Sequence, residues 1–190
     1  MEQIKVIDLE TTGLQSNSEI AQLAIVSLDG NLNPVSFKDM YFNIHEEMPE
    51  EARKVNGLTK TFLEIESGGT FFIDVADMVA EELSGCTLVA HNYAFEKKML
   101  KYWLDGKLDD SKCICTMLRY TPTLGLKDYA GNGGYKYCNL RELTSYIRNV
   151  MGISADELTA RYESFTGKKS KFHDALFDTY VTALALGVLG

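Results

Sequence analysis

V-I-D-L-E-T-T-G-L, from Val6 to Leu14, is the stretch that decides the fold of this 190-residue chain. Residues 4–8 are mostly apolar on both faces, which is typical of a central strand in a sheet that is covered on both sides. Side chains two residues apart in a strand project from the same face, so Asp8 and Glu10 are predicted to point the same way. Two neighbouring carboxylates repel each other, and partial burial makes each harder to ionise. We therefore expect a positively charged group between them.

The segments that follow predict a mixed α/β sheet with helices on its faces. After the first strand, two β-prone segments separated by Asp29-Gly30-Asn31 indicate an antiparallel meander. Further along, segments with a helical period alternate with short apolar strands, which is the pattern of an α/β protein. The predicted strands span residues 4–8, 19–28, 35–44, 87–90 and 112–116, and the predicted helices span residues 49–57, 71–83, 92–104, 139–150 and 175–189, with one more short helix capped by Thr59.

Length and composition indicate a single domain that spans residues 1–190. The chain is 45% hydrophobic and 24% charged, as expected of a globular domain with one substantial core. No apolar run approaches the roughly 20 residues that a membrane helix needs. The N-terminus has no signal-peptide profile, so we expect a cytoplasmic protein that does not contact membranes.

Charge and cysteine content exclude two further classes of protein. The net charge of −8 argues against broad nonspecific binding to nucleic acid, although cations could neutralise carboxylates at a local site. Four cysteines are too few for a disulfide framework, and a spacing of one residue differs from that of common zinc sites. Reduced thiols are therefore predicted at Cys86, Cys113, Cys115 and Cys138.

Two later segments carry polar residues that could meet the first strand. In H-N-Y-A-F-E, at 91–96, a strand ends and a helix begins, with Glu96 about one turn inside the helix. In K-F-H-D-A-L-F-D, at 171–178, His173 precedes Asp178 by five residues, a rotation of about 140° on a regular helix. His173 is therefore predicted in the loop before the helix or at its start. Small residues on the Asp178 face would let this helix approach the sheet closely.

Each of these segments, taken alone, also has an ordinary structural explanation. An aspartate near a turn is often a local hydrogen-bond acceptor, and a glutamate in a first helical turn is often solvated. A lone histidine is often a surface or capping residue, which is the explanation we favour for His45.

Together, however, the three segments resemble the exonuclease motifs of the DEDDh 3′-to-5′ exonucleases. These are D-L-E-T-T-G at 8–13, H-N-x-x-F-E at 91–96 and H-x-A-x-x-D at 173–178. The family includes the proofreading subunit of bacterial DNA polymerase III, ribonuclease T and oligoribonuclease. Order and spacing match over nearly the full chain, and V-N-G-L-T at 55–59 and C-N-L-R-E-L at 138–143 match more weakly. The resemblance implies a ribonuclease H-like fold, with a central mixed five-stranded sheet and helices on both faces.

The resemblance also implies the catalytic roles. Asp8, Glu10 and Asp178 fall on metal-binding positions, and His173 falls on the position of the general base. Glu96 is a departure, because the family usually has Asp there. Its extra methylene could let the carboxylate reach the outer metal with a changed rotamer, or it could weaken that site.

Substrate contacts are implied around the first motif and in the adjoining loop. By resemblance, the turn after the first strand would receive the terminal sugar and base, which would restrict cleavage to a free 3′ end. Asn56 stands where some relatives have histidine, which leaves the local contacts open. The implied substrate-binding residues are Thr11, Thr12, Gly13, Leu14 and Asn92.

Two segments outside the motifs have two interpretations each. The glycine-rich stretch Gly125 to Tyr137 matches neither a dinucleotide fingerprint nor a P-loop, so it is a mobile surface loop or a flap whose tyrosines touch the substrate. A lysine cluster just before the third motif could guide the phosphate strand or form a solvated basic loop. The residues concerned are Tyr129, Tyr135, Tyr137, Lys168, Lys169 and Lys171.

Paired divalent ions would explain why two carboxylates stand together. Ions about 3.5 to 4 Å apart would stabilise the charge that develops on a phosphodiester and acidify the attacking water. Oxygen ligands suit two Mg²⁺, with Mn²⁺ as a substitute. Neutral His173 would accept the proton of that water.

The sequence therefore predicts a metal-dependent 3′-to-5′ exonuclease that releases nucleoside 5′-monophosphates from single-stranded nucleic acid. The alternative is a binding or scaffold subunit whose catalysis is weakened by Glu96. DNA and RNA are equally compatible, because contacts to a 2′ hydroxyl are invisible in the sequence. Because several relatives are dimers, a homodimer is left open. The sequence ends at Gly190, just after the last predicted helix, so we expect a standalone nuclease without a tail that docks to a polymerase.

Overall fold

A five-stranded mixed sheet forms the centre of the computed structural model, which describes residues 3–108, 112–128 and 134–190. The strands are β1 (Ile4–Thr11), β2 (Ile20–Leu28), β3 (Pro34–Tyr41), β4 (Thr87–Ala90) and β5 (Cys113–Cys115). Their order in the sheet is β3-β2-β1-β4-β5. The first three strands pair antiparallel, whereas β4 and β5 run parallel to β1. The predicted fold class and the antiparallel meander are confirmed.

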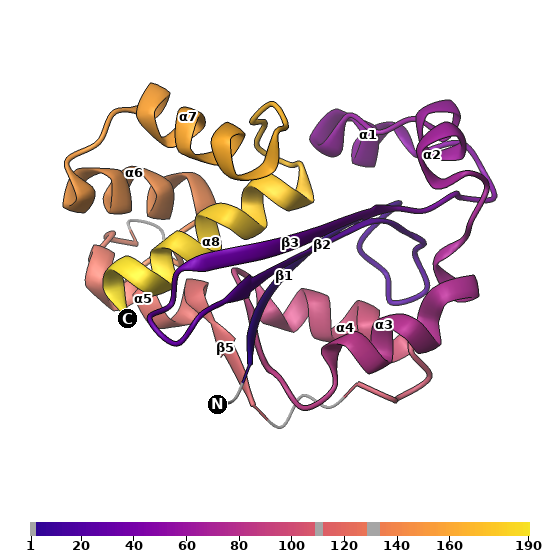
Figure 1. The fold of residues 1–190 in the computed structure, drawn as a ribbon, viewed down its shortest axis with the longest axis horizontal. Helices are drawn as coiled ribbons and strands as arrows, with labels where there is room; N and C mark the ends of the chain where they lie inside the picture. The colour runs from indigo at the N-terminus through magenta and orange to yellow at the C-terminus, as the bar shows by residue number, and fades with distance from the viewer. Residues whose placement is uncertain (1–2, 109–111, 129–133) are drawn as a thin grey trace.

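Helices cover both faces of this sheet (Figure 1). The helices are α1 (Glu50–Asn56), α2 (Lys60–Ser67), α3 (Ala76–Leu83), α4 (Tyr93–Trp103), α5 (Thr116–Leu124), α6 (Leu140–Met151), α7 (Ala155–Thr166) and α8 (Ala175–Leu189), with a 3-10 turn η1 (Phe72–Val75) before α3. One layer contains α6, α7 and α8, and the opposite layer contains α3 and α4 (Figure 1). No helix in the described part of the chain is long and apolar enough to cross a membrane.

Alternation along β1 places the two carboxylates on the α8 side of the sheet. Val6 belongs to the core cluster that includes the buried residues of α8. Ile7 and Leu9 belong to the opposite cluster, with residues of α3 and α4. Because the pleat has a period of two, Asp8 and Glu10 continue the row of Val6. The strand runs three residues beyond its predicted end, because β1 stays paired with β2 up to a bulge at Glu10 and Thr11.

The last helix, α8, has the predicted bounds and packs directly on β1 and β2. It is capped by Asp174, whose side chain accepts hydrogen bonds from the backbone N–H groups of Leu176 at 3.1 Å and Phe177 at 3.3 Å. Ala175 and Ala185 are completely buried, and Thr182 is nearly so. These small side chains allow the close approach of helix and sheet that brings Asp178 to β1.

Three helical segments differ from the prediction. The predicted helix at 71–83 begins as the 3-10 turn η1, because the Asp74 carboxylate accepts the backbone N–H of Phe71 at 2.9 Å. The helix α5 was not predicted, since it follows β5 without a loop and contains Pro122. The helix α7 was also not predicted, although Ser154 caps it by accepting the N–H of Glu157 at 3.0 Å. A capping serine followed three residues later by glutamate was the available signal.

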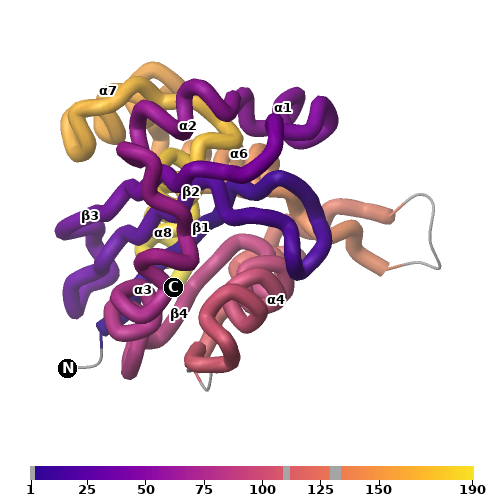
Figure 2. The backbone as a smooth tube through the Cα atoms, turned by 90° about the vertical axis from the view of Figure 1, so that its right-hand side faces the viewer, coloured from indigo at the N-terminus to yellow at the C-terminus, as the bar shows by residue number. Residues whose placement is uncertain are grey.

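The remaining local predictions concern the cysteines, His45 and the glycine-rich stretch. The four cysteines are free thiols, as predicted. His45 pairs with Glu19 and stacks on Phe71, so it has structural partners. In the glycine-rich stretch, Lys127 and Tyr135 form an antiparallel bridge, and the segments on either side project from the body (Figure 2). Tyr135 and Tyr137 are exposed, whereas Tyr129 lies outside the described residues.

Candidate active site

One cleft of about 830 Å³ contains all five residues that the sequence places in the catalytic centre. Asp8 and Glu10 come from β1, Glu96 from the first turn of α4, and Asp178 from the first turn of α8. His173 lies in the loop before α8 and also lines the cleft. Only 9%, 3% and 7% of the surface of Glu10, Glu96 and Asp178 is exposed, so these charges face the cleft from a largely buried position.

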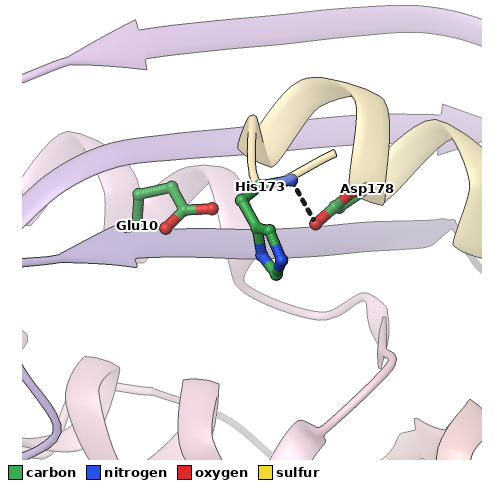
Figure 3. A group of neighbouring side chains, drawn as sticks. All are labelled: Glu10, His173 and Asp178. Carbon is green, nitrogen blue, oxygen red and sulfur yellow. Dashed lines mark hydrogen bonds between the residues drawn. The ribbon is translucent and has the colours of Figure 1, made fainter. Parts of the chain in front are cut away.

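Three of these side chains form a tight group. Ligand atoms of Glu10, His173 and Asp178 all lie within 4.8 Å of one another. Figure 3 shows the Glu10 carboxylate facing the imidazole ring, with Asp178 on the other side of the histidine. Asp8 and Glu96 line the same cleft outside this tight group. The charges of Asp178, Glu96 and Glu10 all raise the pKa of Asp8, after the larger effect of its burial, which places Asp8 in the same electrostatic cluster.

The backbone around His173 explains how two residues five apart reach one site. His173 has φ of 61°, in the left-handed region, and it lies immediately before the capping residue of α8. Its backbone N–H donates to Oδ2 of Asp178 at 3.2 Å, as Figure 3 shows. The chain therefore folds back over the helix start and brings the imidazole next to Asp178. The predicted position before the helix agrees with this geometry.

Burial leaves the carboxyl groups strongly resistant to ionisation. It raises the pKa of Glu10 and of Glu96 to about 8 and that of Asp178 to about 7. Neighbouring carboxylates raise the pKa of Glu10 further, and Asp178 makes the largest contribution among them. Such a cluster is costly at neutral pH unless a cation neutralises it. The expectation of a positive group beside Asp8 and Glu10 is thus reinforced by their surroundings.

The site also contains buried oxygen atoms without a hydrogen-bond partner. Within the described residues, Oε2 of Glu96 and Oδ1 of Asp178 are buried and make no hydrogen bond. Buried polar atoms are nearly always paired, so these two oxygens are available as ligands. Carboxylate oxygens of this kind are the donors that Mg²⁺ and Mn²⁺ prefer, so the residues fit a divalent-cation site.

The environment of His173 favours the neutral imidazole. His173 is exposed at the cleft, and partial desolvation of its ring is the main cause of its lowered pKa; the charges of Arg141 and Lys171 lower the pKa further. A neutral ring nitrogen can accept a proton, as a general base must.

Asn56 and Lys171 support the site from the α1 side. Asn56 is buried, and its Nδ2 donates to the backbone carbonyl of Thr11 at 3.4 Å. The amide of Asn56 also partly offsets the raised pKa of Glu10. Lys171 Nζ donates to the backbone carbonyl of Asn56 at 2.8 Å, which ties the loop of His173 to the end of α1. Asn56, whose role the sequence left open, therefore lies beside the group of Glu10, His173 and Asp178.

The three lysines before His173 all have partners in the fold. Lys168 forms an ion pair with Asp39, and Lys169 Nζ lies 3.3 Å from Oε2 of Glu163. Lys171 donates to the backbone carbonyl of Asn56, as described above. These contacts anchor the loop, so a role in guiding phosphates stays a prediction.

Gln22 is a positioning residue that sequence reasoning missed. It is completely buried opposite Glu10 in the β1–β2 register. Its Oε1 accepts the N–H of Ala175 at 3.2 Å, and its Nε2 donates to Oδ1 of Asp39 at 2.8 Å. The start of α8 is thereby fixed to β2. A single amide in an otherwise apolar strand was the signal that could have found it.

The predicted substrate residues line the same cleft. The turn after β1 is closed by Thr11, whose Oγ1 donates to the carbonyl of Gly13 at 2.6 Å, and Lys98 donates to the carbonyl of Leu14. Leu14 is 74% exposed and therefore accessible at the cleft. Asn92 is the N-cap residue of α4, although its side chain makes no capping hydrogen bond. The predicted residues that line the cleft are Thr11, Thr12, Gly13, Leu14 and Asn92.

Part of the apolar lining comes from α1, α5 and α6 and was not assigned to the site from the sequence. Val55, Met117 and Leu140 contribute apolar surface to the cleft. In the sequence these residues are indistinguishable from core positions of amphipathic helices. Only the packing of their helices shows that they face the cleft.

Comparison with known proteins supports a nuclease family. The sequence model of the family RNase_T, described as Exonuclease, matches residues 6–186. The 3′-5′ exonuclease DinG of Bacillus subtilis is 30% identical over 142 residues, which cover 72% of this chain and 14% of DinG. DNA polymerase III subunit epsilon of Rickettsia prowazekii is 28% identical over 101 residues, covering 52% of this chain and 43% of the subunit. The chain thus matches less than half the length of these curated relatives.

Solved structures show the same fold. Exonuclease I of E. coli in complex with a dT13 oligonucleotide aligns with 100% of this chain and 41% of its own, with a TM-score of 0.71 and 15% identity. Exonuclease X in complex with 5′ overhanging duplex DNA aligns with 97% of this chain and 89% of its own, with a TM-score of 0.61 and 20% identity. With the family match over nearly the whole sequence, these comparisons confirm the resemblance drawn from the three motifs. The chain belongs to the RNase_T family of DnaQ-like exonucleases, within the ribonuclease H-like superfamily.

Proposed function

We propose that this protein is a divalent-metal-dependent 3′-to-5′ exonuclease that removes nucleoside 5′-monophosphates from single-stranded ends. The observation that carries the proposal is the tight group of Glu10, His173 and Asp178 in a cleft that also contains Asp8 and Glu96. These residues come from segments far apart in the sequence, and their types match hydrolysis of a phosphodiester. Family membership supports the same reaction.

The proposed cation ligands are the four carboxylates, and Mg²⁺ is the proposed ion. Two divalent cations bound there would stabilise the charge that develops on the phosphate and acidify the attacking water. Asp8 and Glu10 present their oxygens from one face of β1, while Glu96 and Asp178 bring unpaired oxygens from two helices. Burial holds these ligands in place and keeps competing water away from them.

His173 is the proposed general base. A ring nitrogen of the neutral imidazole accepts a proton from the attacking water, and the lowered pKa keeps that nitrogen available at neutral pH. The hydrogen bond from its backbone N–H to Asp178 fixes the loop, so the ring stays beside the carboxylates.

The turn after β1 is the proposed binding site for the terminal nucleotide. Exposed Leu14 offers apolar surface for a base, and the Thr11 hydrogen bond to Gly13 keeps the turn closed. Binding of a terminal sugar with a free 3′ end against this turn would restrict attack to the end of the strand.

Labelled oligonucleotides test this proposal. The protein is incubated with 5′-labelled and 3′-labelled strands in Mg²⁺, in Mn²⁺ and with a chelator. We expect a ladder that shortens from the 3′ end, early release of the 3′-terminal label as a mononucleotide, and no reaction with the chelator. Asp178→Asn, prepared in parallel, controls for a contaminating nuclease because it removes one ligand charge.

Two other outcomes would change the assignment. Strand binding without nucleotide release in either metal would favour a nucleic-acid-binding or scaffold subunit. Shortening from the 5′ end would contradict the proposed polarity. Matched DNA and RNA strands in the same assay determine the substrate class.

A further inference from the structure

Arg141 is exposed in the first turn of α6. The residue before it, Leu140, lines the cleft. The Arg141 guanidinium lies over the ring of Phe172, with 4.4 Å between its central carbon and the ring centroid. Phe172 precedes His173 and packs edge-on against Phe177, at 5.0 Å between centroids and 88° between planes. The guanidinium is therefore held next to the loop that carries the proposed base.

The charge of Arg141 reaches the catalytic group. It contributes to the lowered pKa of His173, after desolvation of the ring, and it partly offsets the effect of burial on Asp178. The cation that acts on Glu10 is instead Lys171. These directions agree with the stacking on Phe172, which places Arg141 beside the loop of His173.

Arg141 has no acidic partner among the described residues, in contrast to Lys136, Lys168 and Lys169. Lys136 pairs with Glu142, and Lys168 and Lys169 pair with acidic residues of β3 and α7. Stacking on Phe172 occupies one face of the guanidinium and leaves the N–H groups at its edge free to donate. A planar fork of donors matches two oxygens of a phosphate.

We propose that Arg141 binds nonbridging oxygens of a phosphate group in the bound strand, on the His173 side of the cleft. This inference rests on the proposed function and adds a substrate-binding residue to it. Arg141 would compensate, at this point, for the acidic character of the protein, and stacking on Phe172 would reduce the entropy lost when the phosphate binds.

The test compares Arg141→Gln and Arg141→Lys with the control Arg161→Gln. Arg161 is an arginine on α7 that pairs with Glu157 at 2.8 Å and does not line the cleft. Dissociation constants for a fluorescent single strand are measured in Ca²⁺ over a range of salt, and kcat and KM are measured in Mg²⁺. Arg141→Gln should weaken binding about tenfold to a hundredfold, as expected for loss of a charge-assisted contact. Arg141→Lys should recover part of the loss.

Salt dependence gives a readout that a structural role would not change. Loss of one phosphate contact to a single strand should reduce the slope of log K against log salt by about 0.7. The Arg141 variants should keep the melting temperature of the unaltered protein. The control Arg161→Gln should keep its salt slope. Hydrolysis of a nitrophenyl ester of thymidine 5′-phosphate shows which phosphate Arg141 contacts. If Arg141→Gln hydrolyses this ester more slowly, Arg141 contacts the reacting phosphate. If only its rate on oligonucleotides falls, Arg141 contacts a neighbouring phosphate.

The inference is overturned if Arg141→Gln binds with the affinity and salt slope of the unaltered protein. If the unaltered protein binds strands but releases no nucleotide, the proposed function fails while the salt slopes still test Arg141. If it neither binds nor cleaves, both fail.

Discussion

At the scale of single residues, the site depends on carboxyl groups that are buried without enough positive charge around them. Lys171 and the amide of Asn56 partly offset the raised pKa of Glu10, yet that pKa stays at about 8. Glu96 is even more buried and has one oxygen without a partner. Stability is thus reduced locally to keep ligand oxygens available, which is common at functional sites.

His173→Ala distinguishes a base from a metal ligand. A ring nitrogen of His173 lies within 4.8 Å of carboxylate oxygens of Glu10 and Asp178. The geometry is therefore compatible with both roles. As a base, His173 contributes to the rate but not to metal affinity, so turnover should fall about 10²-fold to 10⁴-fold while Mg²⁺ affinity changes little. Single-turnover rates and Mg²⁺ titrations measure the two effects.

His45→Ala is the matched control, because His45 pairs with Glu19 outside the cleft. A parallel loss of Mg²⁺ affinity in His173→Ala would show that the histidine binds the ion. Undiminished turnover would show that it is not the base.

Glu96→Asp tests whether the longer acid is accommodated. The charge of Glu96 contributes to the raised pKa of Asp8, and both residues line the cleft. Shortening it should withdraw a ligand oxygen, so we expect the Mg²⁺-supported rate to be unchanged or to fall by about tenfold. Glu96→Gln, which keeps the length and removes the charge, should lose more. A large gain in the rate of Glu96→Asp would instead show that the natural site is compromised.

At the scale of elements, the loop before α8 is held from two sides. Lys168 and Gln22 both contact Asp39 on β3, and Gln22 also binds the first N–H of α8. On the other side, Lys171 binds the carbonyl of Asn56 at the end of α1. This double attachment fixes the place of His173, so changes remote from the chemistry should alter the rate.

Gly57→Ala tests the attachment to α1. Gly57 caps α1 with φ of 76°, and a β-carbon there would lie 2.5 Å from Nζ of Lys171. Gly68 is the matched control, because it caps α2 with φ of 60° and has no atom within 4 Å of a β-carbon. Gly68→Ala should cost about 1 kcal/mol of unfolding free energy through its backbone alone. In Gly57→Ala the flexible Lys171 side chain would also swing away and lose its hydrogen bond to Asn56, so this variant should cost somewhat more and should lower the exonuclease rate.

A double-mutant cycle isolates the lysine contact. In a Lys171→Met background, the extra cost of Gly57→Ala over Gly68→Ala should largely disappear, since the colliding group is absent. Urea unfolding measures each variant. Equal costs for the two glycines in the natural background would contradict the attachment.

At the scale of the whole molecule, the carboxylate cluster links stability to pH and to metal. Burial raises the pKa of Glu10 and Glu96 from 4.5 to about 8. The folded protein therefore holds protons that the unfolded chain releases, and this contribution to stability is complete below 4.5 and is lost as pH rises through about 8. Mg²⁺ bound as proposed would hold the ionised carboxylates, so its stabilising effect would have the opposite dependence on pH.

The increase in melting temperature caused by Mg²⁺ should thus grow from about pH 5 to about pH 8. Thermal unfolding in Mg²⁺ and in chelator, compared at each pH, cancels the contributions of carboxylates elsewhere. The variant with both Glu10→Gln and Glu96→Gln should show a smaller and flatter effect. A Mg²⁺ effect that is independent of pH in the natural protein would argue against binding at this cluster.

Features that depend on local interactions could be predicted from the sequence, and features that depend on distant contacts could not. The bounds of β4 and α8 agree with the prediction, because capping and apolar runs are local signals. The helix α5 was missed because Pro122 and the absence of a loop hide it locally. The contacts of Gln22 with Ala175 and of Arg141 with Phe172 were missed because they join residues that are distant in the sequence and meet only in the fold.

The sequence by itself determined that Asp8 and Glu10 share one face of a strand, because the period of the pleat is a local property. It also determined that His173 precedes the helix of Asp178, since five residues do not fit one helical face. Only the tertiary structure decided that the Glu10 carboxylate lies beside the His173 ring, and that Glu96 and Asp178 leave oxygens unpaired in the same cleft. Those relations depend on the order of the strands and on the close packing of α8, which non-local contacts set.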